Sequence, residues 1–285
     1  MRFVVLTLAL CATLGAQEVS WEAELNASWV GGATTDLGSG RRGRVTAQSA
    51  LARAVLSRPI FNGPLLRFGG ELHRFSFGLP DAAPLPNTLQ SATAIIGVDL
   101  EISGVLVRIE AKPGLYTTDL EDLEGGDFNV PVIIGGLYIV NKDLQLALGV
   151  SVDVNREYPV LPGGGIRWKF ADRWLLNAIL PRPRLEFEAT DNLTLYAGGE
   201  VRAMTFRVDD DFGRANGDSR LNGACLDYTE LRAGGGFRWQ MGAAFTLEAE
   251  AGWLAYREFN YHRPGFDVTT ESGAPYGQLI LSAKF

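Results

Sequence analysis

The sequence lacks a long apolar run, a set of cysteines and a basic patch. Its only cysteines are Cys11 and Cys225, too few for a disulfide scaffold or a zinc cluster. After the first sixteen residues, no stretch is apolar over the roughly 20 residues that a transmembrane helix needs. The formal charge is −7, and the longest basic run is Arg41-Arg42 with Arg44. We therefore expect no membrane-spanning helix and no nucleic-acid partner.

The composition is that of a folded β-protein. Hydrophobic residues make up 46% of the chain, too many for a disordered acidic polymer. The 34 glycines and the aromatic residues are spread along the whole chain, without a Gly-X-Y period. This distribution argues against a helical bundle and against collagen.

The N-terminus has the pattern of a signal peptide. Arg2 precedes an apolar run over 3–10, and small residues follow up to Ala16. The run is too short to cross a bilayer as a helix. We predict a signal peptide over 1–16 and one exported domain over 17–285. A buried N-terminal strand is the alternative, and a lipoprotein anchor at Cys11 is disfavoured because Leu10 precedes it.

Long alternation of apolar and polar residues predicts β-strands. In 144–155 the six positions from Leu144 to Val154 are aliphatic, and the positions between them are polar or small. Such a strand has one apolar face. The same alternation recurs in several other segments, namely 19–29, 105–112, 230–240 and 245–253.

Two architectures produce this alternation. A soluble sandwich buries its apolar face, whereas a membrane barrel turns it to lipid and its polar face to a lumen. The predicted strands often have 11 to 16 residues, against about 5–6 in a typical globular sheet. Short turns also alternate with long loops, which occupy 31–42, 78–90, 116–127, 209–224 and 259–274. Both features favour an all-β, transmembrane antiparallel up-and-down barrel.

The pattern divides into fourteen strands, an even number that places both termini on the periplasmic side. Strand 43–57 is ambiguous because Arg53 shares a face with Val45 and Leu51. Merging the short pair 173–180 and 183–190 makes twelve the main alternative, provided another strand is also lost. The predicted strands are 18–30, 43–57, 64–77, 91–102, 104–116, 128–140, 143–154, 162–171, 173–180, 183–190, 193–208, 225–240, 243–258 and 275–285.

The C-terminus and the aromatic residues indicate a bacterial outer membrane. Phe285 ends a strand with apolar residues at every second position. This resembles the closing-strand signal that the barrel-assembly machinery reads in outer-membrane barrels. We therefore expect that machinery and outer-membrane lipid as partners. Aromatic residues next to the predicted periplasmic ends share the apolar face, as an interfacial girdle requires: Trp21, Trp168, Phe170, Trp174, Trp239, Phe245 and Phe285.

A short motif occurs twice. Gly163-Gly164-Gly165-Ile166-Arg167-Trp168 is echoed by Gly234-Gly235-Gly236-Phe237-Arg238-Trp239. No Lys-Ser/Thr pair or helix follows, so a phosphate-binding loop is disfavoured, and we expect the glycines to let strands bend or approach closely. The first copy, with 171–176 and 181–186, resembles a family of bacterial outer-membrane β-barrels known only as a domain of unknown function. The likeness is densest over 159–188 and implies no activity, substrate or catalytic residue.

The polar faces predict a charged lumen. Twelve residues are the candidate lining: Arg67, Glu71, Arg108, Glu110, Lys112, Arg167, Glu200, Arg202, Glu230, Arg232, Arg238 and Glu248. Both signs are interleaved, as expected where charges in a low-dielectric wall are paired. The lining is either a salt-bridge lattice that stiffens and narrows the barrel or a selectivity surface for a small polar solute, and the two can coexist.

The sequence offers little support for catalysis. Asp209-Asp210-Asp211 and His262 lie in predicted extracellular loops, where carboxylates and a histidine could form a hydrolase site. The Asp run with Asp218 could instead hold a metal ion. A solvated acidic loop is the simpler interpretation, so we expect no enzyme activity, metal or cofactor. We predict an outer-membrane channel or solute-binding barrel of unknown substrate. A structural or surface-interaction barrel with an occluded lumen is the alternative, and a surface hydrolase is a third.

Overall fold

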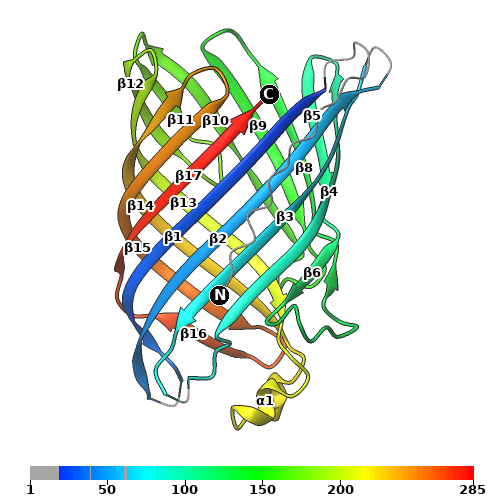
Figure 1. Cartoon of the computed structure of the whole chain (residues 1–285), viewed down its shortest axis with the longest axis vertical. Helices are drawn as coiled ribbons and strands as arrows, with labels where there is room; N and C mark the ends of the chain where they lie inside the picture. The colour runs from blue at the N-terminus through cyan, green and yellow to red at the C-terminus, as the bar shows by residue number, and fades with distance from the viewer. Residues whose placement is uncertain (1–18, 39, 61–62, 82) are drawn as a thin grey trace.

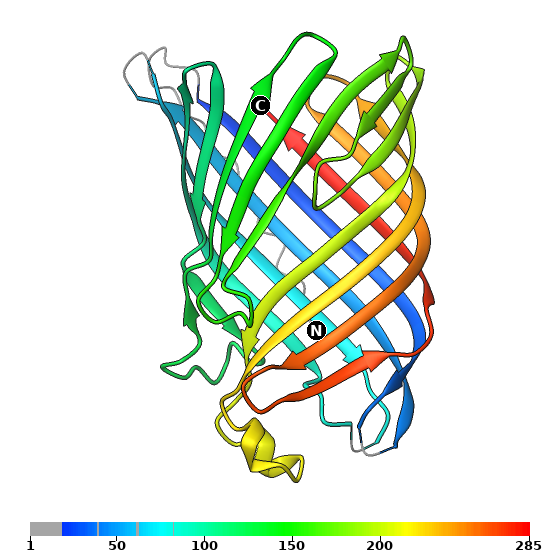
Figure 2. The ribbon, with the colours of Figure 1, turned by 180° about the vertical axis from the view of Figure 1, so that it is seen from behind.

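The computed structural model describes residues 19–38, 40–60, 63–81 and 83–285. The predicted signal peptide over 1–16 lies outside these residues. The described chain forms a single sheet that curves into a barrel (Figures 1 and 2). Its strands are β1 (Ser20–Asp36), β2 (Arg42–Pro59), β3 (Leu65–Gly78), β4 (Thr88–Ile102), β5 (Val105–Ala111), β6 (Gly114–Thr117), β7 (Phe128–Asn129), β8 (Val132–Ile139), β9 (Leu144–Val152), β10 (Val160–Ala171), β11 (Trp174–Asn177), β12 (Arg184–Thr190), β13 (Leu193–Arg207), β14 (Cys225–Met241), β15 (Phe245–Tyr261), β16 (Phe266–Thr270) and β17 (Ala274–Lys284).

The first and last strands close the barrel. β1 pairs antiparallel with β2 on one side and with β17 on the other. The β1–β17 seam runs from Glu22 opposite Lys284 to Val30 opposite Tyr276. Trp21 and Phe285 extend it, because each accepts a backbone hydrogen bond from the other at 2.9 Å. Closure satisfies backbone groups that a sheet edge would leave unpaired.

The seventeen segments make fourteen passes across the barrel wall. β5 continues as β6 beyond Pro113, and β7 continues as β8 beyond Pro131. Proline has no backbone N–H, which explains an interruption of the ladder at each of these positions. β16 likewise continues as β17 in a single pass, after a break at 271–273 that contains no proline. The short β11 and β12 are separate passes. The predicted count of fourteen strands is therefore confirmed, and the alternative of twelve, which merged this pair, is wrong.

The strands extend further toward the loops than the sequence predicts. β1 continues to Asp36 in the predicted loop 31–42, and β16 lies wholly inside the predicted loop 259–274. Thr35 and Asp36 pair with β16, so the two extensions support each other. Val268 of β16 is fully buried, which shows that this part of the wall packs against an interior. The two loop predictions were therefore too long.

The apolar face of the sheet points outward. Leu148 is 77% exposed, and Trp29, Leu72 and Leu279 are likewise exposed on their strands. A soluble sandwich would bury such residues in its core, so that alternative is wrong. The predicted girdle residues are all exposed as well: Trp21, Trp168, Phe170, Trp174, Trp239, Phe245 and Phe285. The ambiguous Arg53 faces inward, because it is paired in register with Glu24 and Glu71.

The two ends of the barrel differ. Tight turns such as Ser103-Gly104 and Asp172-Arg173 lie at the end that holds Phe285, here called the turn end. The long connections lie at the opposite, loop end, where α1 (Phe212–Ala215) and the 3-10 helix Ser219–Leu221 follow β13 (Figure 1). Neither of these described helices has the length and apolar character to cross a bilayer.

Candidate functional site

All twelve candidate lining residues lie on the inward positions of the wall. They come from β3, β5, β10, β13, β14 and β15, with Lys112 directly after β5. Their ladder partners on neighbouring strands are other inward residues, such as Glu200 opposite Arg232 and Arg202 opposite Glu230. The lumen is therefore the candidate functional site, built by alternation along strands that are rigidly paired.

One charged network lies on the wall formed by β1 to β5. The Arg67 guanidinium contacts Glu22 at 3.2 Å and Glu110 at 3.7 Å. Glu71 accepts hydrogen bonds from Lys112 at 2.9 and 3.1 Å. Arg67, Glu71 and Glu110 are all buried. Each buried charge in this group thus has an opposite charge beside it, which offsets the cost of its desolvation.

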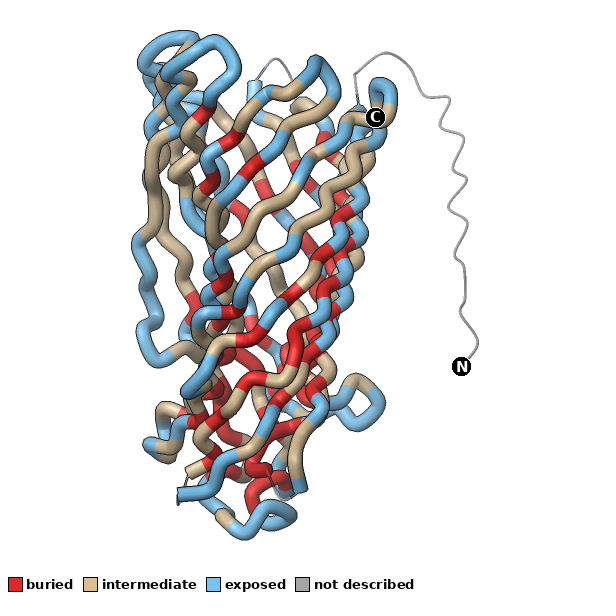
Figure 3. The backbone as a smooth tube through the Cα atoms, turned by 90° about the vertical axis from the view of Figure 1, so that its left-hand side faces the viewer, coloured by how far each residue is buried: buried red, intermediate tan, exposed pale blue. Residues whose placement is uncertain are grey.

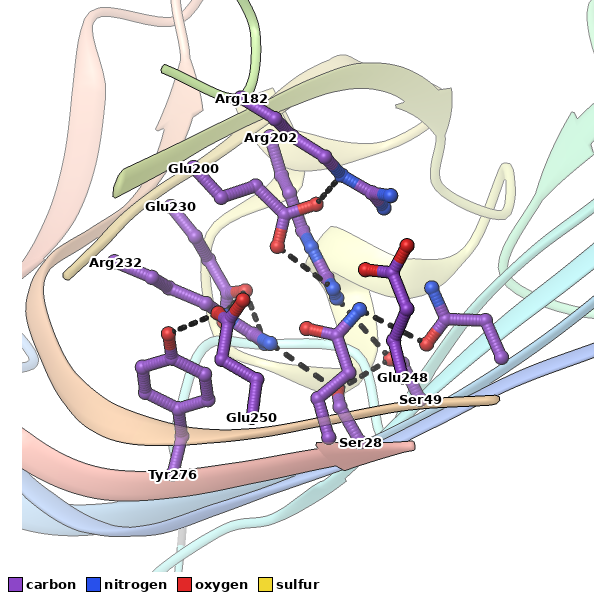
Figure 4. Close-up of polar contacts among 12 residues, drawn as sticks. Ser28, Ser49, Arg182, Glu200, Arg202, Glu230, Arg232, Glu248, Glu250 and Tyr276 are labelled. Atoms are coloured by element: carbon purple, nitrogen blue, oxygen red, sulfur yellow. Dashed lines mark hydrogen bonds and ion pairs between the residues drawn. The ribbon is translucent and has the colours of Figure 1, made fainter. Parts of the chain in front are cut away.

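A second network is centred on Glu230 (Figure 4). One Glu230 oxygen accepts hydrogen bonds from the Tyr228 hydroxyl at 2.5 Å and from Arg257 Nε at 2.9 Å. The other lies 2.6 Å from Arg232 Nη2. The Glu230 side chain is fully buried. A carboxylate held by two guanidiniums and a phenol is a structural ion cluster with no vacant oxygen.

This second network crosses the lumen. Arg232 of β14 donates to Ser28 of β1 at 3.2 Å, and Arg202 of β13 donates to Ser49 of β2 at 3.3 Å. Ser28 and Ser49 are themselves hydrogen-bonded at 2.8 Å. Figure 4 shows the two arginines reaching from one wall toward these serines on the other. Hydrogen bonds therefore tie opposite walls together at mid-height.

The two copies of the glycine-arginine-tryptophan motif differ in their environment. Arg238 donates to Glu248 at 2.8 Å and to Glu186 at 3.1 Å. Arg167 also points inward, yet its guanidinium has no ion pair or hydrogen bond to any described residue. Because Arg167 is also exposed, it is a charged group that the lumen presents to solvent.

The inner wall beside Arg167 is apolar. β8 is apolar on both faces, and its inward positions are Ile133, Gly135, Leu137 and Ile139. Ile133 and Ile139 are 45% and 48% exposed although they face the lumen. Leu161 of β10, on the same inner face, is 36% exposed. The alternation prediction missed this face because Val132–Ile139 does not alternate.

Aromatic residues fill the lumen toward the loop end. Phe75 and Phe77 of β3 pack against Tyr228 of β14 with ring centroids 4.9 and 5.5 Å apart. Phe259 of β15 packs on Phe77 at 5.0 Å, and Phe206 of β13 packs on Phe75 at 6.2 Å. These rings are buried in a hydrophobic core that also contains loop residues such as Leu221. We call these five rings the aromatic cluster.

Solvent exposure decreases along the lumen from the turn end to the loop end. The Arg108 side chain near the turn end is 48% exposed, whereas Glu230 and Arg257 at mid-height are at 0%. Figure 3 shows the buried stretches concentrated in the half that carries the loops. The lumen is thus solvated at the turn end, bridged by charges at mid-height and filled by aromatic rings beyond.

The loop residues weighed for catalysis do not meet. Asp209 contacts the Thr118 hydroxyl, and Asp210 contacts Arg207. His262 Nδ1 lies instead 3.5 Å from Asp227 at the start of β14. Within the described ranges, no three His, Cys, Asp or Glu side chains are grouped to hold a metal ion. These contacts give no support to the disfavoured alternative in which the Asp run and His262 form one site.

A closed barrel with an apolar outer face and a charged interior is a transmembrane β-barrel. The chain belongs to the family described as Domain of unknown function (DUF6268), which matches residues 106–272, more than half of its length. The segment 159–188, where the resemblance is densest, lies inside the matched region. The expectation of a family without an assigned activity is confirmed. No curated protein matches the chain.

Several solved barrels are similar to the chain. The COG4313 outer membrane channel from Pseudomonas putida F1 is 9% identical, with a TM-score of 0.47 over 96% of this chain and 97% of that one. A deletion mutant of the TodX monoaromatic hydrocarbon channel is 11% identical, with a TM-score of 0.41 over 95% and 90%. A Pseudomonas aeruginosa FadL homologue is 10% identical, with a TM-score of 0.37 over 94% and 90%.

Proposed function

We propose that the chain is an outer-membrane barrel whose lumen binds a small solute and conducts it across the membrane. The observation that carries this proposal is the solvated turn-end half of the lumen, lined by charges of both signs and by the unpaired Arg167. A purely structural barrel has no need for an ion without a partner. Charged linings set the selectivity of pores for polar solutes.

The proposed location rests on the outer face and on the ends of the chain. Aromatic side chains such as Trp21 and Phe245 stand exposed near the turn end, where rings favour the headgroup boundary. The signal-peptide pattern over 1–16 supports export. The terminal Phe285 supports recognition by the barrel-assembly machinery. Together these features favour a bacterial outer membrane with the loops outside the cell.

A structural barrel with an occluded lumen is the second candidate. Two observations favour it, namely the aromatic cluster at the loop end and the hydrogen bonds that join Arg202 and Arg232 to the opposite wall. Passage through the lumen requires both to rearrange. Under this alternative the charges serve only to stiffen the wall.

Conductance in planar bilayers separates the two candidates. For the conducting barrel we expect discrete current steps from the wild type and larger steps from Phe259→Ala, because this substitution removes a ring from the aromatic cluster. Phe237→Ala is the matched control, since Phe237 faces outward and lies outside the lumen. If neither the folded wild type nor folded Phe259→Ala gives current steps, the occluded alternative is supported.

A further inference from the structure

The register of the ladder places Arg167 in a row of inward side chains near the turn end. Arg167 of β10 lies opposite Gln145 of β9 and Asn177 of β11, and Gln145 lies opposite Ile139 of β8. The Asn177 Oδ1 atom is buried and has no hydrogen-bond partner among the described residues. The Arg167 guanidinium and the Asn177 amide oxygen thus lack partners within the described part of the chain, whereas the second copy of the motif has Arg238 held by two carboxylates.

Apolar surface continues from this row toward the loop end. The next inward rows contain Leu137 and Ala147, then glycines, then Ile133 and Leu161 on either side of Ser151. A Cβ built on Gly163 would meet nothing within 4 Å, so the space in front of this wall is open. Aliphatic side chains and glycines, with Ser151 as the one polar side chain among them, thus form a strip that begins at a cation. We call this strip, with Arg167, the Arg167 strip.

We propose that the Arg167 strip binds an organic anion with an apolar body, its acidic group at Arg167 and its body along Leu137 and Ile133. This proposal rests on the proposed function and names the class of solute. Guanidinium groups form strong charge-assisted hydrogen bonds with carboxylates. Covering the exposed aliphatic side chains removes apolar area from water. An inorganic anion would leave the strip uncovered, and a neutral apolar molecule would leave Arg167 without a partner.

Three probes that each keep one or both chemical parts of the ligand test the two halves of the site. Hexanoate has both the acidic group and the apolar body, acetate has only the acidic group, and 1-hexanol has only the body. We expect calorimetry on the full barrel in detergent to show hexanoate binding at least about tenfold more tightly than either of the others. Equal affinities for hexanoate and acetate, or for hexanoate and 1-hexanol, would overturn the proposal.

Single-residue variants test whether hexanoate binds at the Arg167 strip. We expect Arg167→Gln to weaken hexanoate about tenfold or more without changing 1-hexanol binding, and Leu137→Asn to weaken both. Lys142→Gln removes the same charge from an exposed turn and should change neither. Arg238→Gln should lower the urea midpoint of unfolding, because it breaks two ion pairs, whereas Arg167→Gln breaks none. Unchanged hexanoate affinity in folded Arg167→Gln would refute the assignment.

The outcome is separable from that of the proposed function, because binding in detergent requires no conduction. Hexanoate binding that depends on Arg167, in a barrel that gives no current steps, would support the Arg167 strip and remove the channel. If the barrel gives current steps but Arg167→Gln binds hexanoate as tightly as the wild type, the channel is supported and this inference is overturned.

Discussion

At the scale of single residues, the lumen contains arginines and carboxylates that are far from water. Glu230 is the extreme case, because its buried carboxylate is surrounded by Arg232, Arg257 and Tyr228. Attraction in a low dielectric offsets desolvation only while every partner is present. Removing one member therefore exposes the others to the full cost of burial.

We predict that Glu230→Gln destabilises the barrel by about 3–5 kcal/mol, because two buried guanidiniums lose their counter-charge. Glu188→Gln is the control. Glu188 pairs with Lys169 at 3.1 Å on an exposed part of the wall, and such pairs contribute about 0–1 kcal/mol. The measurement is the urea midpoint of unfolding from lipid vesicles for both variants. Similar midpoints for the two would contradict the buried-cluster interpretation.

A second residue-scale prediction concerns the face of β9. Leu148 points outward and is 77% exposed, so Leu148→Arg places a charge against the hydrocarbon near the middle of the strand. We expect this to cost about 2–4 kcal/mol. Ala147→Arg is the matched control, since Ala147 faces the lumen on the same strand. The refolding midpoint in vesicles should fall more for Leu148→Arg, and the opposite order would invert the assignment of faces.

Gly149 is a poorer control than its inward position suggests. A Cβ at Gly149 would lie 2.7 Å from the Ile134 carbonyl oxygen, closer than side-chain atoms normally approach backbone. Any side chain there therefore strains the β8–β9 ladder, whatever its charge. We expect Gly149→Ser to lower the refolding midpoint although serine is polar. An unchanged refolding midpoint for Gly149→Ser would show that the two strands can move apart at no cost.

At the scale of whole strands, period-two alternation predicted most of the wall. The pattern in 143–154 and 193–208 matches β9 and β13 closely, because one face meets lipid and the other the lumen. The prediction failed where a local feature breaks the period. A bulge in β15 shifts the register near Leu231, so Arg257 faces inward opposite Glu230 although the parity of the preceding residues places it outward.

The candidate site was less predictable than the wall. The inward position of each charge follows from its own strand, but its partner comes from another strand that the sequence does not identify. Arg167 and Arg238 occupy the same place in the repeated motif, yet only Arg238 meets Glu186 and Glu248. The contact of Arg202 with Ser49 spans 153 residues. Such differences depend on the three-dimensional register and on barrel closure.

An element-scale prediction concerns the closing strand. Deleting Phe285 removes both backbone hydrogen bonds to Trp21 and the ring contact with Phe245 at 5.7 Å. We expect assembly into the outer membrane to fall several-fold. Deleting Gly125, an exposed loop glycine with open space around it, should have little effect. Membrane fractionation of both variants gives the comparison, and equal yields would remove any special role of the terminal aromatic residue.

At the scale of the whole molecule, the chain reverses the usual placement of side chains. Leucines and tryptophans lie outside and ion clusters lie inside, and the aromatic cluster is confined to the loop end. The loop-end half, with its apolar core and the transverse hydrogen bonds at its base, resembles an ordinary protein interior. The turn-end half is held by the wall alone. Closure of the sheet is therefore what keeps the solvated half of the lumen in shape.

Closure makes a prediction for the intact protein. A closed barrel has no edge from which unfolding can begin, so it resists dodecyl sulfate until it is heated. We expect purified protein to migrate faster on a gel when unboiled than after boiling, because the folded form is compact. Ala27→Pro removes a donor from the middle of β1, where Ala27 lies between Leu279 and Ala50. This variant should lose the fast band at temperatures where the wild type keeps it. Identical mobility of unboiled and boiled wild type would mean that the β1–β17 seam is too weak to hold the barrel closed.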